Sequence, residues 1–214
     1  MTLPVNEVFE SVQGEGTFAG TPAVFVRLQG CDVGCGWCDT KHTWAVRPSR
    51  RLPMLEMLAK REDADTYATM TADELVRTVR TYRARHVVIT GGEPAQYDLR
   101  ELAHALVELG YRVQVETSGT RPLQTSHFAW VTVSPKRGAL PEMLAVADEL
   151  KAVIGKYADY EALCADVLPH LPGWVPVYLQ PLSQSPRATA LCVELATKHG
   201  HRVSVQTHKY LGVR

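Results

Sequence analysis

The sequence has 214 residues, which is enough for one domain with a substantial hydrophobic core. Its 23 basic and 23 acidic side chains give a formal net charge of zero, so the composition argues against nucleic-acid and anionic-membrane partners. The sequence has no run of about 18 apolar residues, and its first residues lack the basic and apolar regions of a secretory signal. We therefore expect a cytoplasmic protein that does not bind or cross a membrane.

Short apolar runs alternate with amphipathic patterns along the chain, which is typical of parallel β/α units. The strands expected from these runs are 23–28, 86–90, 112–116, 131–134, 150–154, 176–180 and 202–206. They are apolar on both faces, as in a sheet covered by helices. We therefore predict an α/β fold, a compact and partial (β/α) barrel of mainly parallel strands, in a single domain over 1–214.

Helix boundaries are indicated by capping residues. A capping box at Thr71 predicts a helix that runs to about residue 83, and Asp98 is a candidate cap for 99–109. Another helix is expected from Ser185 to His199, before Gly200. We interpret 41–70 as an insertion with one short amphipathic helix.

Most of the expected strands end in a polar residue. Because the carboxyl ends of the strands build the active site in parallel barrels, we expect these ends to share one rim. For each residue taken alone, an equally good reading is that the strand stops where polarity starts. The polar strand ends are Thr90, Glu116, Ser134, Gln180 and Gln206.

Three of the five cysteines, Cys31, Cys35 and Cys38, have the spacing C-x3-C-x2-C. In a reducing compartment such a group indicates metal binding or catalysis before a disulfide. Three thiolates leave one iron of a 4Fe-4S cluster without a protein ligand, so that iron can bind another molecule. A structural zinc site with His42 as its fourth ligand is the alternative. The other two cysteines, in apolar helical patterns, are expected in the core.

A second motif strengthens the cluster interpretation. The run Thr90-Gly91-Gly92-Glu93-Pro94 ends a strand, and its glycines allow the backbone to approach another molecule closely. Together with the cysteine spacing it resembles the radical S-adenosylmethionine (SAM) superfamily. The resemblance implies a barrel of the radical SAM type, a 4Fe-4S cluster whose open iron is chelated by SAM, and a 5′-deoxyadenosyl radical.

Further motifs are similar to those of one family within that superfamily, the 7-carboxy-7-deazaguanine synthases of queuosine biosynthesis. The similarity implies a lyase that converts 6-carboxy-5,6,7,8-tetrahydropterin to 7-carboxy-7-deazaguanine with loss of ammonia. It also implies Mg2+, an external flavodoxin-like one-electron reductant and a homodimer. The motifs are 9–16, 38–40, 116–120, 134–136, 180–181 and 206–212.

The resemblance also assigns site residues, with no catalytic acid or base because SAM supplies the radical. The cluster ligands are Cys31, Cys35 and Cys38, and Thr40 is the Mg2+ ligand. The residues expected to contact SAM are Trp37, Cys38, Asp39, Gly92, Glu116, Ser134, Pro135, Lys136, Gln180, Pro181, Leu182 and Ser183. The residues expected to contact the substrate are Val12, Gln13, Gly14, Glu15, Arg27, Thr90, His208 and Arg214.

Two of these side chains have support from physical chemistry. Arg27 lies in a strand that is apolar on both faces and needs a partner, either a substrate carboxylate or an internal acid such as Glu116 or Glu10. Glu15 could accept from a paired donor edge of the pterin, or be a solvated loop carboxylate. Glu116 could instead brace Arg27. Two other functions remain open, a radical SAM activase that makes a glycyl radical on a partner protein and a zinc-stabilised binding module.

Overall fold

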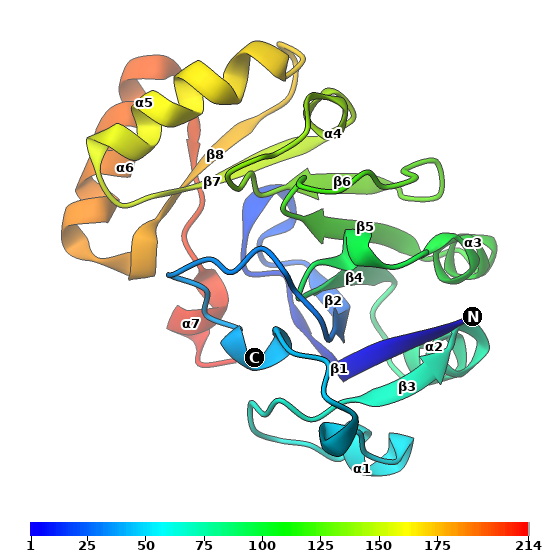
Figure 1. Ribbon diagram of the computed structural model, residues 1–214. Helices are drawn as coiled ribbons and strands as arrows, with labels where there is room; N and C mark the ends of the chain where they lie inside the picture. Colours follow the sequence, from blue (N-terminus) through cyan, green and yellow to red (C-terminus); the bar gives the residue numbers. More distant parts are fainter. Residues whose placement is uncertain (214) are drawn as a thin grey trace. The chain divides into compact units, whose positions relative to one another are not determined.

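The computed structural model of the protein describes residues 1–213, which form two compact units (Figure 1). The first unit comprises Met1–Ser11, Pro22–Glu116 and Gln124–Ala129. The second comprises Val12–Thr21, Thr117–Leu123 and the chain from Trp130 onward. Residue 214, one of the expected substrate contacts, lies outside the described residues.

The first unit carries a mixed sheet in the order β3-β1-β2-β4-β5. Strands β2, β4 and β5 are parallel, whereas β1 and β3 pair antiparallel. Helices α2 and α3 pack beside each other. The strands are β1 (Thr2–Val12), β2 (Pro22–Leu28), β3 (Ala68–Thr71), β4 (His86–Gly91) and β5 (Arg112–Thr117), and the helices are α1 (Met54–Leu58), α2 (Ala72–Val79) and α3 (Arg100–Glu108).

Of the two predicted capping residues, Thr71 is the N-cap of α2, whereas the N-cap position of α3 is Leu99 rather than Asp98. The backbone N–H of Glu74 donates to the Thr71 hydroxyl at 3.2 Å, and Thr71 N–H donates to the Glu74 carboxylate at 2.8 Å. This confirms the capping box, which satisfies donors that the first turn leaves unpaired. Asp98 accepts the backbone N–H of Arg100 at 3.0 Å, so it also binds a first-turn donor. Both helices end before the residues predicted.

The second unit carries a parallel sheet in the order β6-β7-β8-β9. Helix α6 packs on β8 and α5 packs on β7. Ser185 caps α6 by accepting from Ala188 N–H at 3.2 Å, and Gly200 ends it in the left-handed conformation. The strands are β6 (Trp130–Val133), β7 (Glu149–Ile154), β8 (Val177–Pro181) and β9 (Arg202–Val203), and the helices are α4 (Pro141–Ala145), α5 (Tyr157–Asp166), α6 (Pro186–His199) and α7 (Thr207–Leu211).

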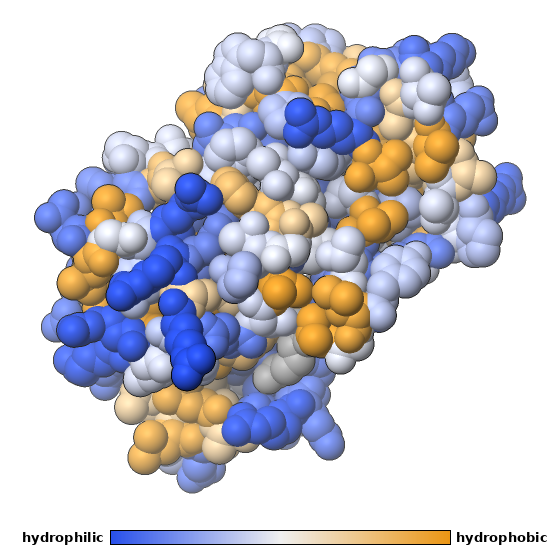
Figure 2. All heavy atoms as spheres, turned by 180° about the vertical axis from the view of Figure 1, so that it is seen from behind, coloured by the Kyte–Doolittle hydropathy of each residue, from blue (hydrophilic) through white to orange (hydrophobic). Residues whose placement is uncertain are grey.

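Single 3-10 turns complete the chain and do not alter the sheet order. They are Gly16–Phe18, Lys41–Thr43, Pro48–Arg50, Pro94–Gln96, Leu168–His170 and Leu182–Gln184. Parallel strands joined by helices dominate both units, which confirms the predicted α/β class. Figure 2 shows hydrophobic residues in separate places among hydrophilic ones on the face it draws. Among residues 1–213, no helix combines the length and hydrophobicity that a bilayer-spanning segment needs.

Four sequence predictions were wrong in detail. Strand β1 was missed because buried Asn6 and Glu7 interrupt its apolar pattern, and each has a side-chain partner on or just after β2. The segment 41–70 does not stay outside the sheet, since its end forms β3 against β1. Strand β9 stops at Val203 rather than at residue 206. Cys192 is buried as expected, but Cys164 is exposed on α5.

Candidate functional site

The cysteine loop of the first unit leaves the end of β2 and returns to its own start. The backbone N–H of Gly30 donates to the Thr43 carbonyl at 2.7 Å, and Cys31 N–H donates to the Trp44 carbonyl at 2.9 Å. Within the loop, Cys38 N–H donates to the Cys35 carbonyl at 3.1 Å. The loop therefore has a closed base, and Cys31 is part of it.

The donor set of this loop fits a 4Fe-4S cluster. All three cysteines are partly exposed and form no disulfide among the described residues. Burial raises the pKa of the Cys31 thiol, but hydrogen bonds from the backbone N–H groups of Val33 and Gly34 act in the opposite direction. Such N–H donors to sulfur are among the groups that set cluster potentials. Within residues 1–213, no three His, Cys, Asp or Glu side chains are grouped as a site for a single metal ion.

The glycine pair at the end of β4 packs against the base of the same loop. Gly91 has φ +120°, and a Cβ atom there would overlap the backbone of Leu28. A Cβ atom on Gly92 would overlap the carbonyl oxygen of Gly30, which also accepts from Glu93 N–H at 2.8 Å. These positions require glycine, and they bring the 90–94 motif against the start of the cysteine loop.

The other SAM and metal candidates of this loop lie within residues 37–40. The Trp37 and Asp39 side chains are both exposed. The Thr40 hydroxyl lies 3.5 Å from the Cys38 sulfur. Its carbonyl accepts from the N–H and the hydroxyl of Thr43, at 2.9 and 2.8 Å. His42, the zinc alternative, has its Nε2 atom 4.0 Å from a carboxylate oxygen of Asp63.

Arg27 has an internal acidic partner in Glu7, which was not one of the two acids expected. Its Nε donates to Glu7 at 2.6 Å, and both side chains are largely buried. Glu10 accepts instead from two backbone N–H groups, those of residues 83 and 84. Glu116 accepts from the Thr90 hydroxyl at 3.2 Å, which joins two of the predicted polar strand ends. Glu7 was missed because β1 was missed.

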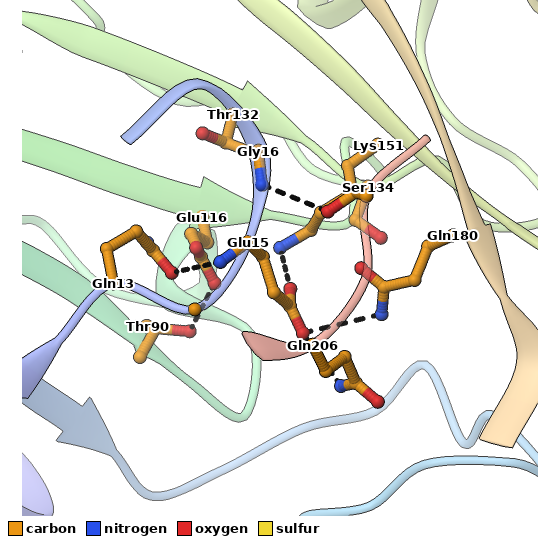
Figure 3. Close-up of polar contacts among 12 residues, drawn as sticks. Gln13, Glu15, Gly16, Thr90, Glu116, Thr132, Ser134, Lys151, Gln180 and Gln206 are labelled. Carbon is orange, nitrogen blue, oxygen red and sulfur yellow. Dashed lines mark hydrogen bonds and ion pairs between the residues drawn. The ribbon is translucent and has the colours of Figure 1, made fainter. Parts of the chain in front are cut away.

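A buried carboxylate organises the second unit (Figure 3). Lys151 of β7 forms an ion pair with Glu15, and the Glu15 side chain is 14% exposed. The Gln206 amide donates to the other carboxylate oxygen at 2.7 Å, and the Gln180 amide lies 3.4 Å from it. Glu15 is therefore not a solvated loop residue, and it brings together Gln180 of β8 and Gln206, which directly precedes α7.

Electrostatics keep this carboxylate ionised. Burial alone raises the pKa of Glu15, but the charge and hydrogen bond of Lys151 act against it. A hydrogen bond from Gln206 and the charge of His208 act in the same direction as Lys151, so that the pKa is about 2. At neutral pH the carboxylate can only accept hydrogen bonds.

The remaining substrate candidates of the second unit are Val12, Gln13 and Gly14, which directly precede Glu15 in the sequence, and His208. The Gln13 side-chain oxygen accepts from Glu15 N–H at 3.1 Å, and Val12 is the last residue of β1. The His208 ring lies directly over Gly14, where a Cβ atom would overlap it. The resemblance placed these residues in one group, and the structure brings His208 to Gly14 across most of the sequence.

The SAM candidates of the second unit form two short structures. Lys136 donates to the carbonyl and the hydroxyl of Ser134, each at 2.7 Å, across Pro135. Gln180 and Pro181 end β8, and the 3-10 turn that begins at Leu182 holds Ser183 at φ 51°, a conformation rare for residues with a side chain. Such backbone strain is common at functional sites. The Gln180 side-chain oxygen is buried without a partner among residues 1–213.

Sequence reasoning missed several charged and polar residues of these groups. Lys151 carries the same signal as Arg27, a charged side chain in a strand otherwise apolar on both faces, but it was not singled out. Gln206 was expected as a strand end only. Lys209 donates to the Gln206 oxygen at 2.7 Å, and nothing in its sequence context indicates that contact.

Comparison with known proteins agrees with this geometry. The Radical SAM superfamily model matches residues 25–152. The 7-carboxy-7-deazaguanine synthases of Escherichia coli K12 and Synechocystis sp. PCC 6803 are 44% and 39% identical, and each match covers 100% of this chain, with 100% and 95% of the relatives.

A solved structure, described as the crystal structure of QueE from Escherichia coli, matches with a TM-score of 0.90 at 43% identity. That match covers 96% of this chain and 94% of the solved one. The likeness confirms the predicted fold, a partial barrel of the radical SAM type. The chain therefore belongs to the 7-carboxy-7-deazaguanine synthase family, whose members are radical SAM enzymes.

Proposed function

We propose that this chain converts 6-carboxy-5,6,7,8-tetrahydropterin to 7-carboxy-7-deazaguanine with loss of ammonia, as a step of queuosine biosynthesis. One observation carries the proposal: the loop with the three cysteines packs against the glycine pair of β4, in a chain that matches synthases from end to end. The comparisons support this function over a glycyl-radical activase and over a zinc-stabilised module.

Cys31, Cys35 and Cys38 are the residues that would hold the 4Fe-4S cluster. When bound, the cluster and SAM supply the radical that starts the reaction. The chain contributes hydrogen bonds to the Cys31 sulfur and, at Gly92, a position without a Cβ that lets the Gly30 carbonyl approach closely. We assign SAM contacts to Trp37, Cys38, Asp39, Gly92 and Glu116 in the first unit, and to Ser134, Pro135, Lys136 and 180–183 in the second.

Arg27 is proposed to bind the substrate carboxylate. A guanidinium has five N–H groups in a planar fork, and Glu7 fixes the plane of this fork by accepting from Nε. In the second unit, the ionised Glu15 is suited to accept from the amino and ring N–H groups of the pterin. Val12, Gln13, Gly14, Thr90, His208 and Arg214 complete the proposed substrate contacts.

The proposal extends to the conditions of the reaction. We assign Mg2+ to the Thr40 hydroxyl, because a neutral oxygen suits a hard cation whose other positions are filled by water and substrate oxygens. We also propose a cytoplasmic homodimer that receives electrons from a flavodoxin-like donor. The family match runs through both units, which supports a single domain over 1–214.

The test is anaerobic reconstitution of the full chain, followed by incubation with SAM, the carboxy-tetrahydropterin, Mg2+ and a reductant. We expect the deazaguanine product by mass spectrometry. Cys35→Ala should abolish both SAM cleavage and product, whereas the exposed Cys164→Ala should retain both. SAM cleavage without product would disprove the substrate assignment and leave the radical chemistry standing.

The Mg2+ assignment has its own test. Thr40→Val keeps the shape of the side chain and removes its oxygen, so the Mg2+ concentration needed for half-maximal product formation should rise several-fold. Thr43→Val would disturb the loop itself, so Thr81→Val, far from the loop in the sequence, serves as the control. An unchanged Mg2+ requirement in Thr40→Val would overturn the assignment.

A further inference from the structure

A chain of buried hydrogen bonds crosses the first unit and ends at the base of the cysteine loop. Lys60 donates its ammonium to the Asn6 side-chain oxygen at 2.9 Å. The Asn6 amide donates to the Gln29 side-chain oxygen at 2.6 Å. The Gln29 amide then donates to the backbone carbonyls of His42 and Ala45, at 3.0 and 2.8 Å. Every link points in the same direction, from the ammonium towards the loop.

The orientation of each side-chain amide in this hydrogen-bond chain is fixed by the groups around it. Asn6 and Gln29 are both 0% exposed, so water cannot replace a missing partner. The second N–H of the Asn6 amide is shared between the carbonyls of Ala64 and Thr66, at 2.9 and 3.2 Å, and Lys60 donates to the same two carbonyls at 3.2 and 3.1 Å. Rotating either amide by half a turn would place oxygen against oxygen. Buried networks of this kind specify one arrangement when every member is satisfied.

This chain of hydrogen bonds ends at the closed base of the cysteine loop. The two carbonyls bound by Gln29, those of His42 and Ala45, flank the residues that pair with Gly30 and Cys31. Thr43, between them, holds the carbonyl of Thr40 with two hydrogen bonds. The Gln29 carbonyl itself accepts from the Tyr97 hydroxyl at 2.6 Å. One glutamine therefore ties the outgoing and the returning arms of the loop.

Lys60 belongs to the segment 41–70, which the sequence presents only as an insertion. Burial lowers the pKa of Lys60 to about 8, partly opposed by the charge of Asp63, while Arg27 adds to the lowering and Asp65 opposes it. The amine is therefore mainly protonated at neutral pH and has three N–H donors. The ammonium donates to the Asn6 side chain and to the carbonyls of Ala64 and Thr66, so the segment 41–70 provides the charged donor at which the hydrogen-bond chain begins.

We propose that Lys60, Asn6 and Gln29 are positioning residues that set the geometry of the cysteine loop, and that the segment 41–70 serves the cluster in this way. The segment then acts on the cysteine loop through the hydrogen bonds of Lys60, Asn6 and Gln29. The inference rests on cluster binding within the proposed function, and it is independent of the pterin.

The test compares Gln29→Leu and Lys60→Met with the full wild-type chain. Hydrogen–deuterium exchange of the metal-free chain reports the loop directly. We expect peptides covering 30–45 to exchange about tenfold faster in both variants, as follows from losing one or two buried hydrogen bonds. Peptides from β7 and β8 should be unchanged. Arg61→Met is the matched control, because Arg61 is the next residue, is exposed and donates to the carbonyls of Leu58 and Lys60.

Reconstitution supplies the second measurement. We expect both variants to lose the absorbance of the cluster several-fold faster than wild type in the presence of a chelator, and Lys60→Arg to restore part of the lifetime. Faster exchange spread evenly over both units would show a general structural role and overturn the proposal, as would unchanged exchange in 30–45. If Gln29→Leu does not fold, Lys60→Met decides alone. Failure of wild type to make product would count against the pterin assignment only.

Discussion

Lys151→Met tests the buried ion pair of the second unit. The methionine keeps most of the volume of the lysine stem and removes the charge that faces Glu15. The carboxylate then retains the Gln206 donor and the more distant Gln180, but it has lost the cation that offsets its burial. The variant should therefore be less stable, and its Glu15 should take up a proton more easily.

The magnitude follows from the pKa. The shift of Glu15 from 4.5 to about 2 corresponds to roughly 3 kcal/mol in favour of the charged form. Breaking a buried pair by removing one partner costs about 3–5 kcal/mol, because a charge is left uncompensated. We therefore expect Lys151→Met to lower the free energy of unfolding by about 3 kcal/mol at pH 7. Adding Glu15→Gln should recover most of the loss, because the neutral amide needs no cation.

The sign of the pH dependence is also determined. The pKa of Glu15 is lower in the folded chain, so its contribution is complete above pH 4.5 and is lost as the pH falls towards 2. The stability difference between wild type and Lys151→Met should shrink over that range.

Urea denaturation of the metal-free, full-length chain measures both effects, with the exposed Lys198→Met as the control. A loss of unfolding free energy below about 1 kcal/mol in Lys151→Met would contradict this prediction. No recovery on adding Glu15→Gln would contradict it as well.

Three further predictions concern single positions. Gly92→Ala should lose most of the bound iron and sulfide, because its Cβ would overlap the Gly30 carbonyl. Gly36→Ala, which has open space around its Cβ, should keep them. Equal iron and sulfide content in the two variants would contradict this. Arg27→Lys keeps the charge but loses the planar fork, so KM for the pterin should rise about tenfold with SAM cleavage intact; an unchanged KM would remove the role. Thr71→Ala deletes the capping box and should cost about 1 kcal/mol in unfolding experiments without changing product formation.

The parts of this molecule that the sequence predicts are those with local causes. The capping box at Thr71 involves residues three apart, and Gly91 ends its strand at φ +120°, a backbone conformation that favours glycine. The three cysteines likewise lie within one loop, and their spacing alone indicates cluster binding. These features were predicted correctly because the interacting groups are neighbours in the chain.

The parts that escaped prediction depend on distant partners. Strand β1 contains Asn6 and Glu7, which look like loop residues until Gln29 and Arg27 are placed beside them. The pair Glu15–Lys151 joins residues 136 positions apart. Only the three-dimensional arrangement shows that their charges cancel.

The central claim is that this chain contracts the ring of a carboxylated pterin. Its most direct test is the mass spectrum of an anaerobic reaction of the reconstituted full chain with SAM and 6-carboxy-5,6,7,8-tetrahydropterin. We expect 7-carboxy-7-deazaguanine together with an equal amount of ammonia, and neither from the Cys35→Ala variant. An intact cluster that cleaves SAM but returns the pterin unchanged would contradict it.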